Sequence, residues 1–197
     1  MSRHFLSFVF LCAAMAFAGS VWDFPIAEKT EPLEDALRTL SDSDSVSGTF
    51  EQIRTIEKIN RSFRSSGKFE ISKATGILWK IEKPFFSEMR ITDSSIVQLD
   101  ADGVRTEISS KDNAVFGEIA RMMRSVLFGD LSGLQKRFRI YFVQNGKNWK
   151  IGLVPSEETV QKVLRSIVVE GNRVLKKVEL VDGEGNRLNY DFRTAQK

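Results

Sequence analysis

The sequence predicts a mostly β fold with a few helices, built on one strongly curved antiparallel sheet. Apolar and polar residues alternate with a period of two through residues 46–109 and 139–192, which is typical of strands that bury one face. Turn-forming segments separate these stretches at short intervals, and short connections favour antiparallel neighbours. About ten strands are expected, and a sheet of that size must curl or close. Helices are then needed to cover its concave side.

The expected strands follow one another closely along the chain. They comprise residues 46–56, 66–72, 77–82, 86–92, 96–99, 104–109, 139–143, 149–154, 165–170, 174–181 and 188–192. Asp100–Gly103 has the composition of a hairpin turn. This acidic turn lacks the long loop and distal glutamate of an EF-hand, so we expect a plain turn and no calcium site. Asn145-Gly146 suits a type I′ turn between two later strands.

Two helices are expected where the apolar period lengthens. Residues 31–40 place four apolar side chains on one face, with Thr30 as the N-cap. These apolar residues are Leu33, Ala36, Leu37 and Leu40. Residues 113–128 form the second predicted helix, Gly129 is placed to end it, and residues 130–137 are expected to add another turn or two.

The first eighteen residues, 1–18, have the features of a secretory signal peptide. Arg3 supplies the charged start, Phe5–Ala14 is almost entirely apolar, and Ala16–Ala18 is an A-x-A cleavage site. The apolar run is shorter than the roughly 20 residues that a membrane span needs. We therefore expect export to the periplasm and a single mature domain over residues 19–197.

The signal peptide holds the one cysteine, Cys12, and the one histidine, His4. Cys12 is not expected to carry lipid, because Leu11 occupies the preceding position, where lipoprotein signal peptidases require a small residue. The mature domain then has no thiol nucleophile, disulfide, imidazole base or His/Cys metal ligand. This excludes most hydrolase, redox and zinc chemistry, so we expect a binding protein with no catalytic residues, metal or cofactor.

Two other classes of function remain beside binding of a ligand. A cofactor-free enzyme would need Asp, Glu, Lys, Tyr or Arg as acid–base groups, and Glu157-Glu158 is better explained as charge at a helix start. A sensor or interaction module of the same fold is the second alternative. Without Arg3, 28 basic residues face 26 acidic ones, and this mild excess does not predict nucleic-acid binding.

Large apolar residues recur on one face of the expected strands. Period-two alternation places Phe69 and Ile71 on one face of the strand at residues 66–72. Four residues on the next two strands are expected to point the same way, and Phe50 joins them from the first strand. The four further residues are Trp79, Ile81, Met89 and Ile91. Met122 and Met123 add to this lining from the second helix. Either these side chains form an ordinary core or they line an apolar cavity that holds acyl chains.

The order of several short motifs resembles that of the LolA family, the periplasmic carriers of outer-membrane lipoproteins. The motifs are the S-x-x-F-x-Q of Ser47–Gln52, the G-x-F of Gly67–Phe69, the Pro84-containing strand, and V-E-L-V-D-G-E-G-N before a strand that ends in Phe192. The resemblance implies an incomplete antiparallel barrel, covered by helices, whose apolar cavity holds the acyl chains of a lipid or lipoprotein. It also implies an inner-membrane donor and an outer-membrane acceptor, and we expect a monomer.

Two departures from the family pattern are expected to affect cargo handling. Where the family has Arg-Pro, with the arginine latching the lid helices, this chain has Lys73-Ala74. Lysine is a point donor, so the latch should be looser or absent. Arg121 and Arg124, which flank the two methionines, are candidates for contact with a headgroup or membrane surface. The family's further F-x-F segment is also missing after Phe192, which predicts a divergent paralogue and leaves a lipid other than a lipoprotein open as cargo.

Overall fold

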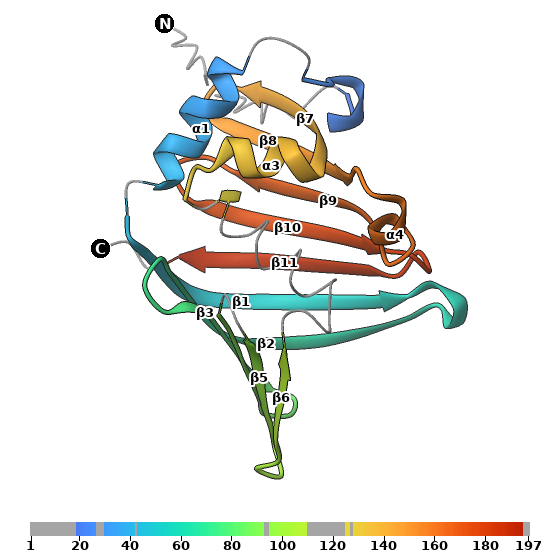
Figure 1. The fold of residues 1–197 in the computed structure, drawn as a ribbon. Coiled ribbons are helices and arrows are strands. Elements are labelled where there is room, and N and C mark those ends of the chain that lie inside the picture. The colour runs from blue at the N-terminus through green and yellow to red at the C-terminus, as the bar shows by residue number, and fades with distance from the viewer. Residues whose placement is uncertain are drawn as a thin grey trace, which may run out of the picture.

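Eleven strands form one antiparallel sheet in the order β6-β5-β4-β3-β2-β1-β11-β10-β9-β8-β7 (Figure 1). The computed structural model describes residues 19–26, 30–41, 43–92, 95–109, 125–126 and 128–194. The strands are β1 (Ser45–Ile56), β2 (Arg61–Ser72), β3 (Gly76–Lys83), β4 (Ser87–Ile91), β5 (Ser95–Asp100), β6 (Arg105–Ser109), β7 (Phe138–Asn145), β8 (Asn148–Pro155), β9 (Leu164–Gly171), β10 (Leu175–Asp182) and β11 (Arg187–Thr194). The helices are η1 (Val21–Asp23), α1 (Glu31–Ser41), η2 (Glu57–Ile59), α3 (Leu131–Arg137) and α4 (Glu158–Gln161).

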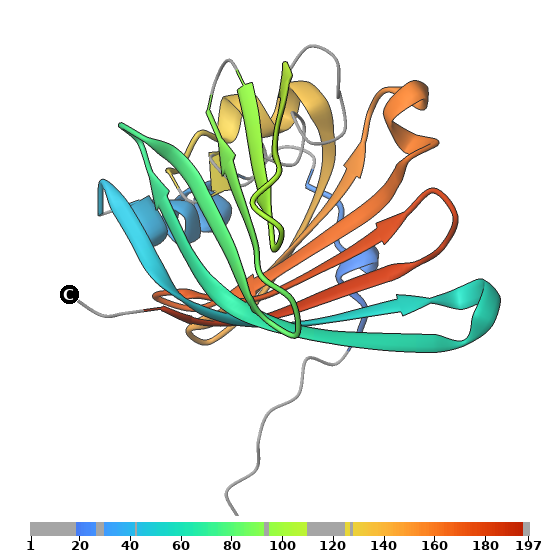
Figure 2. The ribbon, with the colours of Figure 1, turned by 90° about the horizontal axis from the view of Figure 1, so that it is seen from below.

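One long-range pairing joins two halves of the sheet. Strands β1–β6 and β7–β11 each follow a simple meander, and the two meanders meet where β1 pairs with β11. The sheet curves strongly without closing, and β6 and β7 are its two outermost strands (Figure 2). The predicted curved antiparallel sheet is therefore confirmed. β2 begins at Arg61, five residues earlier than predicted. Its first five residues are strand because they pair with β1, although they do not pair with β3.

Helices α1 and α3 lie on the concave side of this sheet (Figure 2). The helix predicted over residues 31–40 is confirmed, with the Glu34 amide donating to the Thr30 carbonyl over 2.9 Å. The turns predicted after Gly129 are confirmed as α3, and Gly129 itself has the positive φ of 74° that suits a helix end. Ser125 and Val126 are helical, but the rest of the helix predicted over residues 113–128 falls largely outside the described residues, as does the predicted signal peptide.

A single apolar core joins α1 to the concave face of both meanders. The four predicted apolar residues of α1 are buried, together with Leu134 of α3. From the sheet, buried core residues include Phe50, Phe69, Ile71, Ile77, Ile140, Trp149, Ile151, Leu153, Ile167, Val169, Val178, Leu180 and Phe192. Because these come from eight of the eleven strands, all but β4, β5 and β6, burial of this face is what holds the curved sheet in shape.

Of the two predicted hairpin turns, the one at Asp100–Gly103 is confirmed and the one at Asn145-Gly146 is not. The Asp100 turn is confirmed: its Oδ1 accepts from the backbone amides of Asp102 and Val104 over 3.0 and 2.9 Å, so turn amides occupy this carboxylate oxygen. The predicted type I′ turn at Asn145-Gly146 is wrong. Asn145 pairs with Asn148, so the central residues are Gly146 and Lys147, and of these Gly146 alone has a positive φ, of 59°. A glycine at the first central position is the pattern of a type II′ turn.

Residues 24–26 cover the outer edge of β7. The Ile26 amide donates to the Ile140 carbonyl over 3.0 Å, and the Phe142 amide donates to the Phe24 carbonyl over 3.0 Å. An isolated bridge between Pro25 and Tyr141 lies between these bonds. The segment satisfies backbone groups that would otherwise make β7 an open edge. The basic run at residues 136–139 spans the end of α3 and the start of β7, and Phe138 within it is buried.

Candidate functional site

The strand register brings the predicted apolar residues of the first meander onto the concave face. Phe69 lies opposite Trp79, which lies opposite Met89. A second row joins Ile71, Ile77 and Ile91, and a third joins Ile81, Gly67 and Phe50. Residues directly opposite one another in an antiparallel pair point to the same side of the sheet. All seven strand residues proposed from the sequence therefore share one face.

Burial divides these seven residues into two groups. Phe50, Phe69 and Ile71 are 2%, 3% and 0% exposed and belong to the core. The other four remain partly exposed, and three of them pack directly against the core. This second group is Trp79, Ile81, Met89 and Ile91. The concave face is thus a packed core on one side that continues into a partly exposed apolar surface on β3 and β4.

An aromatic cluster lies at the boundary between these two groups. The rings of Phe50 and Trp79 stack with centroids 4.2 Å apart, and Trp79 meets Tyr190 edge to face at 5.3 Å. Phe192 completes the cluster, 5.2 Å from Phe69. Stacked and edge-to-face contacts between aromatic rings add to the free energy gained by burying them. The cluster gives the concave face a broad, polarisable apolar surface.

Tyr190 and Phe192 were absent from the site predicted from the sequence. Their alternation with polar neighbours in β11 does indicate a shared face. However, placing that face beside Phe50 requires the pairing of β1 with β11, in which Phe50 lies opposite Phe192 and Gln52 opposite Tyr190. No local pattern in the chain indicates that pairing.

The close approach of β3 to β2 explains why the G-x-F motif has a glycine at position 67. A Cβ atom built at this position would collide with the carbonyl oxygen of Lys80 on β3. The register between β2 and β3 shifts at Ser66 and Gly67, which brings the two backbones close together there. Only a residue without a side chain allows β3 to approach and set Ile81 beside Phe50.

The Tyr190 hydroxyl lies in an apolar setting. Burial raises the pKa of Tyr190 to about 12, and the nearby Arg54 guanidinium opposes part of that rise. Within the described residues the hydroxyl has no hydrogen-bond partner. A buried hydroxyl without a partner costs free energy. Tyr190 is therefore a polar group held at the edge of the aromatic cluster.

Lys73, the residue predicted to replace the lid arginine, lies in the turn between β2 and β3. Its Nζ atom forms an ion pair with Asp44 Oδ1 at 3.0 Å and lies 5.4 Å from the centroid of the Phe128 ring. Phe128 itself packs against the core. The other predicted lid and headgroup residues, Arg121, Met122, Met123 and Arg124, lie outside the described residues.

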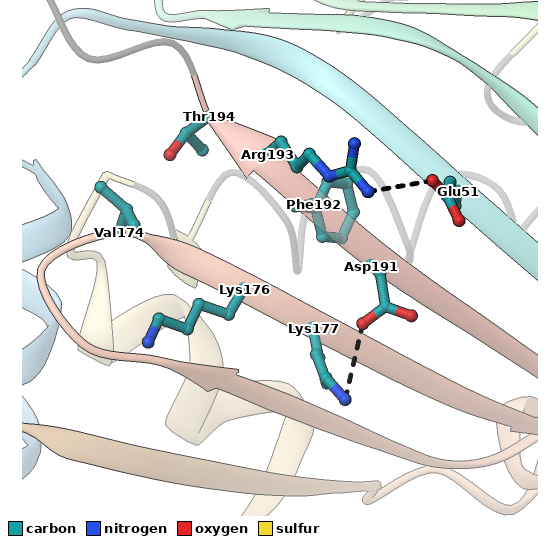
Figure 3. A pocket seen from close by; sticks show the side chains of 8 residues that line it. All are labelled: Glu51, Val174, Lys176, Lys177, Asp191, Phe192, Arg193 and Thr194. Carbon is teal, nitrogen blue, oxygen red and sulfur yellow. Dashed lines mark hydrogen bonds and ion pairs between the residues drawn. The ribbon is translucent and has the colours of Figure 1, made fainter.

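A separate, open hollow of about 730 Å³ lies on the opposite, convex face (Figure 3). Glu51, Asp191 and Arg193 line it, and each alternates along its strand with a residue of the concave core. Arg193 Nη2 pairs with Glu51 at 3.1 Å, and Lys177 Nζ pairs with Asp191 at 3.5 Å. Four of its five charged side chains pair with one another and Lys176 carries the fifth charge, so this hollow differs in chemistry from the apolar concave face.

Comparison with known proteins identifies the family. The sequence profile described as "Outer membrane lipoprotein carrier protein LolA" matches residues 41–197 of this chain. The chain belongs to the LolA family. No match was found among curated proteins.

Several solved structures are similar to this LolA-family chain. The LolA superfamily protein NE2245 from Nitrosomonas europaea is 10% identical with a TM-score of 0.43, and the match covers 84% of this chain and 91% of that one. LprF from Mycobacterium bovis is 11% identical with a TM-score of 0.41, covering 86% and 93% of the two chains. A DUF1329 family protein from Desulfovibrio piger is 10% identical with a TM-score of 0.42, covering 82% and 89%.

Two further properties of this LolA-family protein bear on its chemistry. Over the ranges that the structure describes, no group of three or more His, Cys, Asp or Glu side chains is placed to hold a metal ion. Among the same residues, no helix has both the length and the apolar character to cross a membrane. The chain has the fold of a lipid-binding carrier family, and its apolar concave face is the candidate site.

Proposed function

We propose that this LolA-family protein is a periplasmic carrier that binds acyl chains of a lipid or lipoprotein on its concave face. In this role it moves them from an inner-membrane donor toward an outer-membrane acceptor. The observation that carries the proposal is the continuity of the apolar face: Trp79, Ile81 and Ile91 extend the core, yet stay partly exposed. A contiguous exposed apolar surface in a water-soluble domain marks an interaction site.

The chemistry of this face suits acyl chains. Each buried CH₂ group contributes about 0.8 kcal/mol, so a chain of ordinary length binds firmly without any hydrogen bond. Met89 adds a flexible thioether side chain that adapts to irregular shapes. A lining of this kind selects ligands by volume, because it offers few directional contacts.

The open sheet supports reversible binding. The sheet ends at β6 and β7 without closing (Figure 2), so a ligand on the concave face need not cross a hydrogen-bonded wall to leave. Two short helices, α1 and α3, cover part of that face in the described structure. A carrier must release its cargo as well as shield it, and partial cover of the apolar face serves both needs.

Native mass spectrometry of protein purified from the periplasm tests this proposal directly. We expect a protein that begins at Gly19, is unmodified by lipid, and is accompanied by a non-covalent adduct with the mass of a lipid or acylated peptide. Displacement of a neutral apolar dye, N-phenyl-1-naphthylamine, by alkyl-chain ligands provides the second measurement. A protein that carries no adduct, binds no dye and instead forms a stable complex with another protein would overturn the carrier function in favour of an interaction module.

A further inference from the structure

A row of polar residues interrupts the apolar lining of the concave face. Two residues beyond Phe50 on β1 lies Gln52, which is opposite Ser65 on β2 and Tyr190 on β11. The strand register therefore places an amide and two hydroxyl groups side by side on the concave face. Successive rows on one face of a strand are about 6.6–6.8 Å apart, so this polar row adjoins the aromatic cluster directly.

The next row along the same strands carries a cation. Arg54 lies between Phe63 on β2 and Leu188 on β11. It is close enough to Tyr190 for its charge to act on the Tyr190 hydroxyl. One row further, Arg61 of β2 lies opposite Ile56. Over three rows the concave face thus passes from the aromatic cluster to a row with an amide and two hydroxyl groups, and then to a row in which Arg54 lies between the apolar Phe63 and Leu188.

These polar groups have no partners in the described part of the chain. Gln52, Ser65, Arg54 and Arg61 form neither an ion pair nor a side-chain hydrogen bond there, and the Tyr190 hydroxyl likewise has none. On the convex face of the same strands, Lys68 lies 2.8 Å from Glu82 and Arg193 lies 3.1 Å from Glu51, whereas Arg64 and Glu70 form no ion pair or side-chain hydrogen bond within the described residues. Donors without partners next to an apolar surface are typical of a ligand site.

We propose that the concave face binds an amphiphile with an anionic headgroup, whose chain lies on the Phe50–Trp79 aromatic cluster and whose headgroup lies against Arg54. This proposal rests on the proposed function and adds a substrate class to it. Arg54 supplies the planar guanidinium that pairs with carboxylate or phosphate oxygens. Gln52, Ser65 and Tyr190 donate to the remaining headgroup oxygens.

The spacing of the rows fits such a ligand. Arg54 is two rows from Phe50, which corresponds to about 13–14 Å along the strand, and the polar row lies between them. A headgroup of a few atoms spans this interval while its chain reaches the ring surface. Phe63, 53% exposed and opposite Arg54, provides apolar contact beside the charge.

The test compares ligands that share one chain and differ in headgroup. Dodecyl phosphate, dodecanoate and neutral dodecyl maltoside, each below its micelle concentration, compete with N-phenyl-1-naphthylamine for the protein. We expect at least one of the two anions to bind about tenfold more tightly than the maltoside, a free-energy difference of about 1.4 kcal/mol. The two anions distinguish a phosphate headgroup from a carboxylate.

A pair of matched variants locates the effect. Arg54→Gln should abolish the preference for the anion and leave binding of dodecyl maltoside unchanged. Arg64→Gln is the control, because Arg64 lies on the same hairpin opposite Ile53 and so faces the convex side; it should retain the preference. Thermal unfolding of both variants confirms that each is folded.

The outcomes separate the two proposals. If all three ligands displace the dye equally well from the wild type, the headgroup proposal is overturned and the carrier function stands. If Arg64→Gln loses the preference as fully as Arg54→Gln, the effect comes from overall charge, which also overturns the headgroup proposal. If no ligand displaces the dye and the dye itself does not bind, the carrier function fails first.

Discussion

Lys73 contacts both Phe128 and Asp44: its Nζ atom lies 5.4 Å from the centroid of the Phe128 ring and 3.0 Å from Asp44 Oδ1. Asp44 follows α1, and Phe128 immediately precedes Gly129 and the turn into α3. One side chain from the β2–β3 turn therefore contacts both segments that bring helices over the concave face. A lysine at this position makes contacts that a point charge can make, in place of the planar hydrogen bonds of an arginine.

Removing the Lys73 charge should loosen this arrangement modestly. The Lys73 side chain is 45% exposed, and a cation–π contact at such a site contributes about 0.5–1 kcal/mol. We expect Lys73→Met to lower the free energy of unfolding in urea by about that amount and to speed dye release a few-fold, while Lys73→Arg preserves both. Asp44→Asn is the control that removes the ion pair alone. If Asp44→Asn reproduces the whole effect, the ring contact with Phe128 has no role.

A buried charge should distinguish the core from the proposed ligand surface. Ile71 is 0% exposed, so Ile71→Lys buries an ammonium group without a partner and should prevent stable folding. Ile81 is partly exposed, so its lysine variant should fold with a smaller loss of stability and bind the dye at least tenfold more weakly. Lys80 lies on the opposite face of the same strand, so Lys80→Gln should neither lower stability nor weaken dye binding.

Circular dichroism melts and dye titrations on these three variants give the result. Equal loss of stability in Ile71→Lys and Ile81→Lys would mean that both positions are ordinary core. In that case the apolar surface of β3 and β4 could not be a site for acyl chains.

Tyr190 should make stability fall at high pH. Its pKa in the folded protein is raised to about 12 by burial, whereas an unfolded tyrosine ionises near pH 10. Above about pH 10 the unfolded chain loses this proton and the folded protein keeps it, so stability is lost progressively between about pH 10 and pH 12. The loss at most approaches about 2–3 kcal/mol.

The variant Tyr190→Phe isolates this contribution from the titration of lysines. We expect its urea midpoint to fall less steeply than that of the wild type across the same pH window. Parallel pH profiles for the two proteins would show that the hydroxyl is in contact with water. The same variant should weaken the binding of dodecyl phosphate more than the binding of dodecyl maltoside.

Asp130 should stabilise the start of α3. Its Oδ1 accepts from the Gly133 amide and the Ser132 hydroxyl, both at 2.9 Å, and these hydrogen bonds lower the pKa of the Asp130 carboxyl. Stability from this group is present above the unfolded pKa near 3.9 and is lost as the pH falls through the lower folded pKa. We expect Asp130→Ala to cost about 1 kcal/mol at neutral pH.

Urea unfolding at pH 7 and pH 3 measures both effects. Ser132→Ala, which removes one of the hydrogen bonds but leaves the Gly133 cap, should cost less. A full-sized loss in Ser132→Ala would place the stabilisation in the hydroxyl contact and not in the helix cap.

The order of motifs along the chain and its period-two alternation were enough to predict the strands, the antiparallel sheet and the family. They also predicted that Phe69, Trp79 and Met89 share a face. Both results rest on local geometry. Side chains alternate along any strand, and neighbouring strands joined by short turns pair in a register that the turns restrict. The error at Gly146 arose at this same level, because an Asn-Gly pair is compatible with more than one placement of the turn.

The composition of the candidate site was decided by contacts between distant parts of the chain. Pairing of β1 with β11 brings Tyr190 and Phe192 to Phe50, and it sets Gln52 and Arg54 in rows with β11. Lys73 likewise meets Phe128 only in the folded protein. Local sequence cannot specify these long-range contacts, since many strands present apolar faces of similar character. The choice among them depends on which arrangement buries the most apolar surface around one core, and that is a property of the whole chain.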